Sequence, residues 1–237
     1  PKSTKLLATI CRIGSDKDSF ILDFFAGSGS TAHAVMQLNA EDGGTRKCIS
    51  VQLPEPTDEK SEAFKAGYTN IAEITKERIR RAGEKIKKEN EGAAIDKLDV
   101  GFKAFKLDSS NITAWDGNPD NLEQQLDVFA NNIKTNRTEE DILFEILLKY
   151  GLDLTVPIEE KNIAGKTVYS IGLGTLFICL ADGITPQISE GIGAWKQELN
   201  PSICRAIFKD SGFASDKDKV NAMQILKRFG IEEVNSI

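Results

Sequence analysis

The stretch SFILDFFAGSGST at residues 19–31 decides the fold. Its first part, 19–25, is a short and nearly continuous apolar run, which is typical of a strand buried in a parallel sheet. The run leads into a turn that contains Gly27 and Gly29, and residues 31–38 then read as a helix. Glycine tolerates positive φ and lets a ligand approach the backbone closely, while the free amides of a helix N-terminus favour an anionic group. The stretch therefore predicts a ligand site at the carboxyl end of a strand.

On both sides of this stretch, apolar periodicity predicts further elements of one α/β unit. Helices are expected at 3–13 and 71–89, and strands at 47–53 and 101–107. The helix at 71–89 is the clearest, because its apolar residues repeat with a 3.6-residue period and Asn70 with Glu73 forms a capping pair before it. The order strand, turn, helix, strand, helix, strand is that of a parallel α/β sheet.

The remaining sequence predicts a polar boundary and then a second, smaller α/β unit. Residues 117–137 are rich in Asn, Asp and Gln, and a helix is expected within them near 121–132. Thr138 and Asp141 then cap another helix. The later elements are expected as a hairpin at 167–171 and 176–180, a helix at 185–197, a strand at 203–208, a helix at 216–229 and a strand at 232–236. The predicted fold class is therefore α/β.

Composition narrows the class of protein. Hydrophobic residues make up 40% and charged residues 28% of the chain, which is ordinary for a globular protein with a buried core. The net charge of −6 argues against a surface coated in phosphate-binding groups, although a local basic stripe can still bind DNA.

None of the four cysteines forms a C-x-x-C pair, so a metal site has no support and free thiols fit a cytoplasmic protein. No apolar run approaches the ~20 residues of a membrane span, and the start at Pro1 without Met or a signal peptide predicts an excised fragment.

The glycine spacing by itself fits two kinds of cofactor. Gly27-x-Gly29-x-x-Ala32 also satisfies the fingerprint of dinucleotide-binding proteins. Asp23 and the two aromatic residues after it interrupt the apolar entry that such proteins have. The second strand ends in Gln52, where a dinucleotide site has an acid for the ribose. A nicotinamide-dependent oxidoreductase is therefore kept as a minor hypothesis.

Longer segments resemble a family of DNA methyltransferases. The segment PKSTKLL at 1–7, followed by FILDFFAGSGST at 20–31, resembles the β-class amino-methyltransferases of DNA, in which K-P-x-x-L-L directly precedes D-x-F-x-G-S-G-T. The segments KCISVQLPE at 47–55 and GFKAFKLDSSN at 101–111 are similar to the modification (Mod) subunits of type III restriction–modification systems. The resemblance extends to IGAWK at 192–196 and FKDSGFASD at 208–216.

This resemblance implies a fold, an activity and partners. Residues 1–117 are expected to hold part of a Rossmann-like methyltransferase sheet, 118–160 a helical connector, and 161–237 a small α/β C-terminal domain. The whole protein is expected to transfer a methyl group from S-adenosylmethionine to the exocyclic amine of adenine. Its implied partners are DNA, a second Mod subunit and the restriction (Res) subunit, with no membrane partner.

The resemblance also implies which residues hold the cofactor. The glycine turn is expected to wrap the methionine part of S-adenosylmethionine, and Gly29 with the amides after it to face the ligand's carboxylate. The candidates on the turn are Asp23, Phe25, Ala26, Gly27, Ser28, Gly29 and Ser30.

Two further groups of residues are candidates for the same pocket. Lys2, Ser3 and Thr4 occupy the place of the segment that helps close it, although Ser3 stands where the class has proline. Gln52 stands where the class has an acid that holds the ribose hydroxyls. Either Gln52, through its amide, or Glu55 takes that role, and the sequence leaves both open.

The catalytic motif of the class is absent from the chain. That motif, D/N/S-P-P-Y/F/W, binds the exocyclic amine and stacks an aromatic ring on a flipped-out base. The chain has no Pro-Pro pair, and NPDN at 118–121 lacks both the second proline and the aromatic residue. In β-class enzymes this motif lies N-terminal to the cofactor motif. We therefore expect no catalytic residue in this chain and no methylation of DNA by the chain alone.

Several conspicuous residues have simpler interpretations. His33 has no visible partner and is expected to pack on its helix. Residues 76–88 hold seven basic side chains and two acids, which favours a solvated helix face over DNA contact. Residues 108–110 fit an adenine or ribose contact and a capping turn equally well.

A non-enzymatic alternative concerns the C-terminal part. From about residue 140 onward the chain is interpreted as an assembly module that dimerises Mod or docks Res. Trp195 and Phe213 are candidate contact residues there, although packing within the domain is favoured for both.

Overall fold

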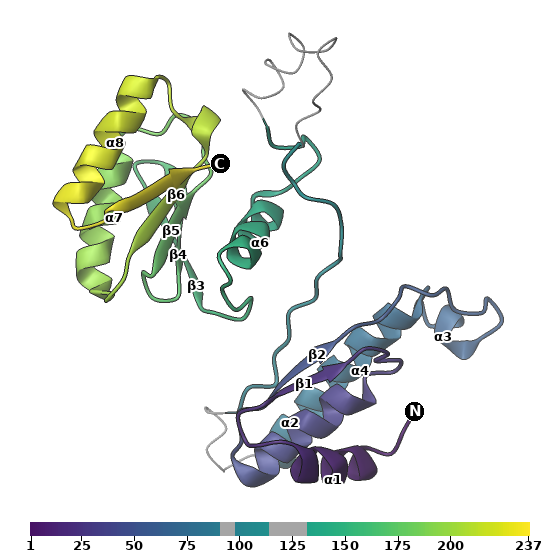
Figure 1. Cartoon of the computed structure of the whole chain (residues 1–237). Coiled ribbons are helices and arrows are strands. Elements are labelled where there is room, and N and C mark those ends of the chain that lie inside the picture. The colour runs from purple at the N-terminus through teal and green to yellow at the C-terminus, as the bar shows by residue number, and fades with distance from the viewer. Residues whose placement is uncertain (91–97, 114–131) are drawn as a thin grey trace. The chain divides into compact units, whose positions relative to one another are not determined.

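The computed structural model describes residues 1–90, 98–113 and 132–237 (Figure 1). The chain forms two compact units, Pro1–Lys106 and Leu107–Ile237. Both units combine helices with a sheet, so the predicted α/β class is confirmed at that level. In the described part of the chain, every helix is too short or too polar to cross a membrane.

The first unit contains a small parallel sheet. Its elements are α1 (Thr4–Gly14), β1 (Phe20–Asp23), α2 (Ser30–Asp42), β2 (Lys47–Ser50), α3 (Glu62–Lys65) and α4 (Ile71–Glu89). β1 and β2 run parallel, with Phe20 opposite Lys47. One face of this sheet packs on α2, because Ile21 and Cys48 lie against Val35 and Leu38. Helices α1 and α4 both contact α2, so α2 lies at the centre of the unit.

Helix α4 confirms the prediction from its periodicity and caps. It spans the residues expected for it, 71–89. The Asn70 side chain accepts a hydrogen bond from the amide of Glu73 at 3.0 Å, which satisfies one of the free donors of the first turn. Its apolar stripe, including Ile79 and Ile86, packs against α2.

The strands of the first unit differ from prediction. The strands expected at 19–25 and 47–53 are shorter, and they are half-buried on one face and exposed on the other. Phe20 is 64% and Leu22 49% exposed, because α2 packs on one face of the sheet while the other carries these side chains outward. The strand expected at 101–107 is wrong: the segment alternates like a strand, but it joins no sheet in the described part of the chain.

The second unit contains a five-stranded mixed sheet. Its elements are α6 (Glu139–Lys149), β3 (Ile158–Ile163), β4 (Lys166–Ile171), β5 (Leu176–Cys179), α7 (Pro186–Leu199), β6 (Arg205–Phe208), the 3₁₀ turn η3 (Asp210–Gly212), α8 (Asp216–Arg228) and β7 (Glu233–Ser236). The strand order is β3-β4-β5-β6-β7. The first three strands are antiparallel neighbours and the last three run parallel.

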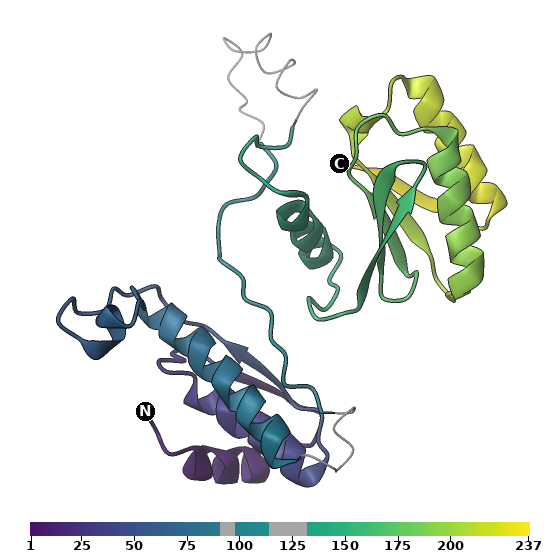
Figure 2. The ribbon, with the colours of Figure 1, turned by 180° about the vertical axis from the view of Figure 1, so that it is seen from behind.

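Helices cover both faces of this sheet (Figures 1 and 2). Helices α7 and α8 pack on the face that carries Val168 and Phe177. Helix α6 packs on the opposite face, which carries Tyr169 and Ile178. Successive side chains of a strand point to opposite faces, so each strand supplies both layers of the core.

The elements of the second unit were largely predicted. The hairpin, the capped helix α6 and the later helices and strands are confirmed with small shifts of their ends. Strand β3 was missed, because Glu159, Glu160 and Lys161 make it read as a polar loop. Charged residues are common on such edge strands, where they discourage pairing with other chains. The helix expected near 121–132 falls, except for its last position, outside the described residues.

Candidate functional site

The glycine turn lies between β1 and α2, as the sequence predicts. Gly27 has φ +53° and Gly29 has φ +73°, and Gly29 is the N-cap of α2. These are left-handed conformations that side chains other than glycine rarely adopt. Asp23 ends β1, and its carboxylate accepts a hydrogen bond from the amide of Phe25 at 3.2 Å. The turn thus starts from a fixed strand end.

The amides of the turn divide into bonded and free groups. Ala26 donates to the carbonyl of Val51 at 3.1 Å, and Gly29 donates to the carbonyl of Ala26 at 2.8 Å. The Gly29 amide is therefore used inside the turn. Within the described chain, the amides at 30–32 have no acceptor, as is usual for the first turn of a helix. The groups that can meet an anion thus begin at Ser30.

The two glycines have different surroundings. A Cβ on Gly27 would meet only the carbonyl oxygen of Phe25, at 3.9 Å, so the space beside Gly27 is open. A Cβ on Gly29 would lie 3.1 Å from Ile79 Cγ1 and 3.3 Å from Thr75 Cγ2. Gly29 therefore lets α2 and α4 approach closely, while Gly27 leaves room for a ligand.

Side chains from outside the turn bind its backbone. Gln52 Oε1 accepts a hydrogen bond from the Gly27 amide at 2.7 Å. Thr75 Oγ1 donates to the Gly27 carbonyl, and Arg78 Nη1 donates to Ser28 Oγ at 3.1 Å. Thr75 and Arg78 were missed by the sequence analysis. One signal was available for Thr75, since it is a polar residue on the buried side of an otherwise apolar helical stripe.

The side chains on the turn itself are partly accessible. Ser28 is half-buried, and its hydroxyl lies 3.2 Å from that of the buried Ser30. The Phe25 side chain is 85% exposed, and the neighbouring Phe24 is exposed as well. An exposed aromatic ring at the mouth of an open turn is available to cover an apolar part of a ligand.

The remaining candidates lie at the edges of the site. Lys2 and Ser3 are exposed, and Thr4 begins α1. Within the described residues, no hydrogen bond or ion pair joins any of the three to the glycine turn. Glu55 is exposed, and its carbonyl accepts a hydrogen bond from Ile71.

The segment at 108–110 belongs to the second unit. Asp108 forms an ion pair with Arg137 at 2.8 Å. Ser109 accepts a hydrogen bond from Lys134, and Ser110 donates one to Glu145. These contacts give the segment a structural role, which favours the turn interpretation over an adenine contact.

His33 and the charged face of α4 show no sign of a catalytic role. Burial lowers the pKa of His33, and the nearby charge of Arg78 lowers it further, so this histidine is neutral at pH 7. On α4, ion pairs at i,i+3 and i,i+4 spacing join Lys76 to Glu73 and Arg80 to Glu77. Such pairs are typical of a solvated helix face.

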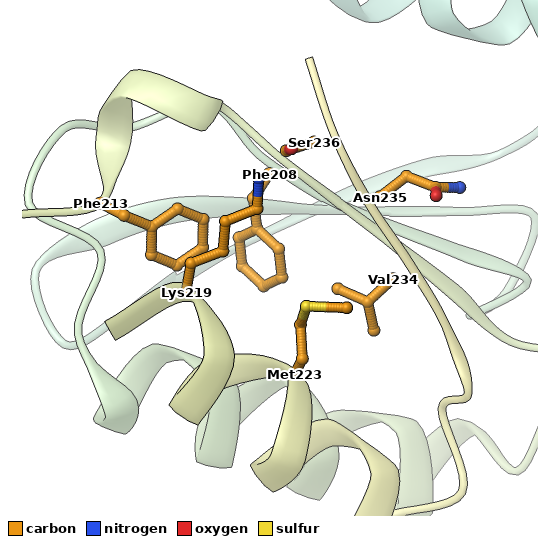
Figure 3. A pocket seen from close by; sticks show the side chains of 7 residues that line it. All are labelled: Phe208, Phe213, Lys219, Met223, Val234, Asn235 and Ser236. Carbon is orange, nitrogen blue, oxygen red and sulfur yellow. The ribbon is translucent and has the colours of Figure 1, made fainter. Parts of the chain in front are cut away.

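A cavity of about 330 Å³ lies in the second unit (Figure 3). Its walls come from β6, β7, α8 and the loop after β6, and consist of Phe208, Phe213, Lys219, Met223, Val234, Asn235 and Ser236. Lys219 Nζ is already paired with Asp210. Phe213 packs against Phe208, with ring centroids 5.4 Å apart, and Trp195 packs against Phe177 in the same way. Both aromatic residues therefore pack within their own domain.

The sequence of the chain is similar to those of known proteins. Residues 1–90 match the DNA methylase family. The chain is 32% identical over 220 residues to the Mod subunit of the type III restriction-modification enzyme EcoP15I from Escherichia coli, which covers 91% of the chain and 31% of that subunit. It is 32% identical over 222 residues to the EcoPI Mod subunit from Escherichia phage P1, with 92% and 31% covered. It is 47% identical over 107 residues to the StyLTI Mod subunit from Salmonella typhimurium, with 45% and 16% covered.

Residues 1–90, which include the glycine turn, are therefore similar to the DNA methylase family. The chain as a whole is related to Mod subunits of type III restriction–modification enzymes. It spans less than a third of the length of these relatives.

Proposed function

We propose that the chain is the cofactor-binding and C-terminal portion of an adenine-specific DNA methyltransferase of a type III restriction–modification system. The observation that carries this proposal is the open glycine turn before α2, in a region that matches the DNA methylase family. The cofactor is S-adenosylmethionine, which supplies the methyl group when it is bound. In the whole protein that group is transferred to the exocyclic amine of adenine in DNA.

The residues of the turn serve this cofactor in distinct ways. The open space beside Gly27 accommodates the methionine part of the ligand. The free amides at 30–32 and the N-terminal end of α2 attract its carboxylate. The exposed ring of Phe25 covers the ligand from the solvent side. Asp23, Ala26, Ser28 and Gly29 shape the turn around it.

The ribose and the pocket entrance involve the edges of the site. Of the two candidates for the ribose hydroxyls we favour Glu55, because its carboxylate is exposed while the Gln52 amide bonds to Gly27 and to Leu53. Residues 2–4 close the pocket once the rest of the domain is present. The catalytic motif of the class is missing from the sequence, so the chain alone does not methylate DNA.

The first unit is proposed to be part of a Rossmann-like sheet. Phe20, Leu22 and Ile49, which are 48–64% exposed, form an apolar face of β1 and β2. Related Mod subunits are more than three times as long as the chain's match to them. We propose that other parts of such a protein cover this face and bring the catalytic motif to the turn.

Calorimetry with S-adenosylmethionine, its demethylated product and NAD tests the assignment. The first two ligands are expected to bind and NAD is not. Gly27→Ala is expected to abolish binding, because its methyl group and the strain at φ +53° disturb the cradle. Gly43→Ala is the matched control, since Gly43 also has positive φ (+67°) but lies at the far end of α2. Binding of NAD without the methyl donor would contradict the proposal.

A second function is proposed for the C-terminal part, which we assign as a helical connector at 118–160 and a small domain at 161–237. The observation that favours it is a separate hydrophobic core, remote in sequence from the glycine turn. We propose that this part assembles Mod dimers or docks the Res subunit in a cytoplasmic DNA-bound complex. A chain that stays monomeric in light scattering at high concentration would contradict dimerisation through this part.

A further inference from the structure

The backbone of Gly27 is held at both of its polar groups by side chains from distant elements. Gln52 follows β2 and accepts from the Gly27 amide, while Thr75 on α4 donates to the Gly27 carbonyl. Arg78, one turn further along α4, holds the hydroxyl of Ser28. Each contact joins residues 25 to 50 positions apart in the sequence. The turn is thus shaped by tertiary contacts in addition to its own sequence.

Such contacts matter because two glycines make a turn flexible. Glycine loses more conformational freedom on ordering than any other residue, so fixing its backbone costs free energy. If the turn is already ordered in the folded protein, a ligand binds without the entropic cost of ordering it. Bonds to both the amide and the carbonyl of Gly27 fix the orientation of the peptides on either side of it.

The register of α4 supports the same arrangement. Thr75, Arg78 and Ile79 lie at i, i+3 and i+4, so they share one face of the helix. Thr75 and Ile79 also form the wall against which Gly29 packs. The Asn70 cap fixes where α4 begins and therefore where this face points.

The amide of Gln52 is committed to the protein. Its Oε1 receives the Gly27 amide, and its Nε2 donates to the carbonyl of Leu53 at 3.0 Å. A carboxylate at this position could also accept from Gly27. It would, however, place a negative charge beside the helix end that must attract the ligand's carboxylate. A neutral acceptor leaves that attraction intact.

We infer that Gln52, Thr75 and Arg78 are positioning residues that hold the glycine turn in its ligand-ready shape, and that Gln52 contacts the turn and not the ribose. This inference rests on the proposed function of the turn in binding S-adenosylmethionine. The three residues act through Gly27 and Ser28, without touching the methyl group.

The positive charge of Arg78 adds to this role. Its guanidinium contacts Ser28, the residue before the N-cap Gly29 of α2. Burial is the main cause of the lowered pKa of His33 on α2, and the charge of Arg78 lowers that pKa further. Arg78 therefore contributes positive potential at the same helix end as the free amides. Because it reaches the turn through Ser28, its effect on the ligand is expected to depend on that hydroxyl.

The first experiment measures hydrogen exchange of single amides by NMR in the 237-residue chain without ligand. In Gln52→Ala, exchange at Gly27 is expected to rise about tenfold, while Gly29, which donates to Ala26, stays protected. Gln37→Ala is the matched control, because Gln37 is a half-buried glutamine of α2 whose side chain donates to Glu41 instead of to the turn. Unchanged exchange at Gly27 in Gln52→Ala would overturn the assignment.

The second experiment compares affinities for S-adenosylmethionine. Gln52→Ala is expected to bind about tenfold more weakly. Gln52→Glu is expected to keep the protection of Gly27 yet bind no more tightly than the unaltered chain. Tighter binding by Gln52→Glu would show that position 52 holds the ribose, and the inference would fail.

The third experiment tests whether Arg78 acts through Ser28. Arg78→Ala and Ser28→Ala are expected to weaken binding several-fold each, and the double variant little more than either. Arg81→Ala is the control on the same helix, because Arg81 pairs with Glu77 instead. Fully additive effects would contradict the role of Arg78.

If the unaltered chain binds no S-adenosylmethionine, the proposed function fails, whereas the exchange experiment still decides whether Gln52 holds the turn.

Discussion

The two units of the chain bury their apolar residues to different degrees. In the second unit, helices cover both faces of a five-stranded sheet, and Phe177 and Phe208 are fully buried. In the first unit, α2 covers one face of a two-stranded sheet, and Phe20 and Leu22 on the other face are exposed. One unit is therefore stabilised by its own core, while the other presents the glycine turn on a partly covered sheet.

The largest effect is expected in the core of the second unit. Phe177 on β5 is completely buried under α7, where the centroid of its ring lies 5.4 Å from that of Trp195. Phe177→Ala removes these contacts and leaves a cavity, so it should lower the free energy of unfolding by about 3–5 kcal/mol. Hydrogen exchange followed by mass spectrometry reports this loss separately for residues 107–237.

The matched variant in the first unit is Phe25→Ala. Its ring is 85% exposed, so its removal should change the free energy of unfolding by less than about 0.5 kcal/mol. If Phe177→Ala and Phe25→Ala lowered the free energy of unfolding by similar amounts, the two units would not differ in how deeply they bury their apolar residues.

The next effect concerns acid stability of the second unit. Burial opposes ionisation of Glu145, but hydrogen bonds from Ser110, Lys149 and the Asn111 amide outweigh it and lower the pKa of this carboxyl to about 2. A lowered pKa stabilises the folded state above the ordinary value near 4.5, and this contribution is lost as the pH falls from there toward 2. Because the carboxyl is only partly buried, solvent screening limits this contribution to about 2 kcal/mol.

Urea unfolding between pH 7 and pH 2 measures this dependence. Glu145→Gln should be less stable at pH 7, and the difference from the unaltered chain should shrink as the pH falls. Glu198→Gln is the control, because the ion pair of Glu198 with Lys161 is exposed and contributes little to stability. A difference for Glu145→Gln that stays constant with pH would contradict the pKa shift.

The same contrast explains what sequence could predict. Helix α4 was predicted with its bounds because its caps and its apolar stripe are local in the sequence. The turn was predicted because Gly27 and Gly29 must take positive φ between a strand and a helix. In the second unit the hairpin of β4 and β5 was predicted because both strands are apolar and buried.

Features that depend on distant partners were missed. The expected strand at 101–107 has the right alternation, but a strand exists only beside a neighbour, and it pairs with none in the described chain. Strand β3 carries charges along an edge and gives no apolar signal. Thr75 and Arg78 reach the turn across about 50 residues. The local pattern marks Thr75 only as a polar residue on a buried stripe, and it does not show which distant residue Thr75 contacts.

A smaller effect is expected at the junction of the turn with α4. Gly29→Ala must keep φ near +73° and place its methyl group 3.1 Å from Ile79, so it should destabilise the first unit by about 1–2 kcal/mol. Gly14→Ala is the control. A Cβ added at Gly14 would have no neighbour within 4 Å, and Gly14 lies in α1, where alanine is favoured. Thermal unfolding of both variants checks the difference. Equal stability of the two variants would contradict the close approach of α2 and α4.

The smallest effect on stability is expected on the open face of the first unit. Leu22 is half exposed beside Phe20 and Ile49, so Leu22→Ser should change the free energy of unfolding by less than about 0.5 kcal/mol. The same variant should reduce self-association in sedimentation velocity, because contiguous exposed apolar side chains favour contact between chains. A loss above about 1.5 kcal/mol would mean that the face is already covered within the chain, since only buried leucines cost that much. The contrast between the units would then reduce to one of size, because both sheets would be covered on both faces.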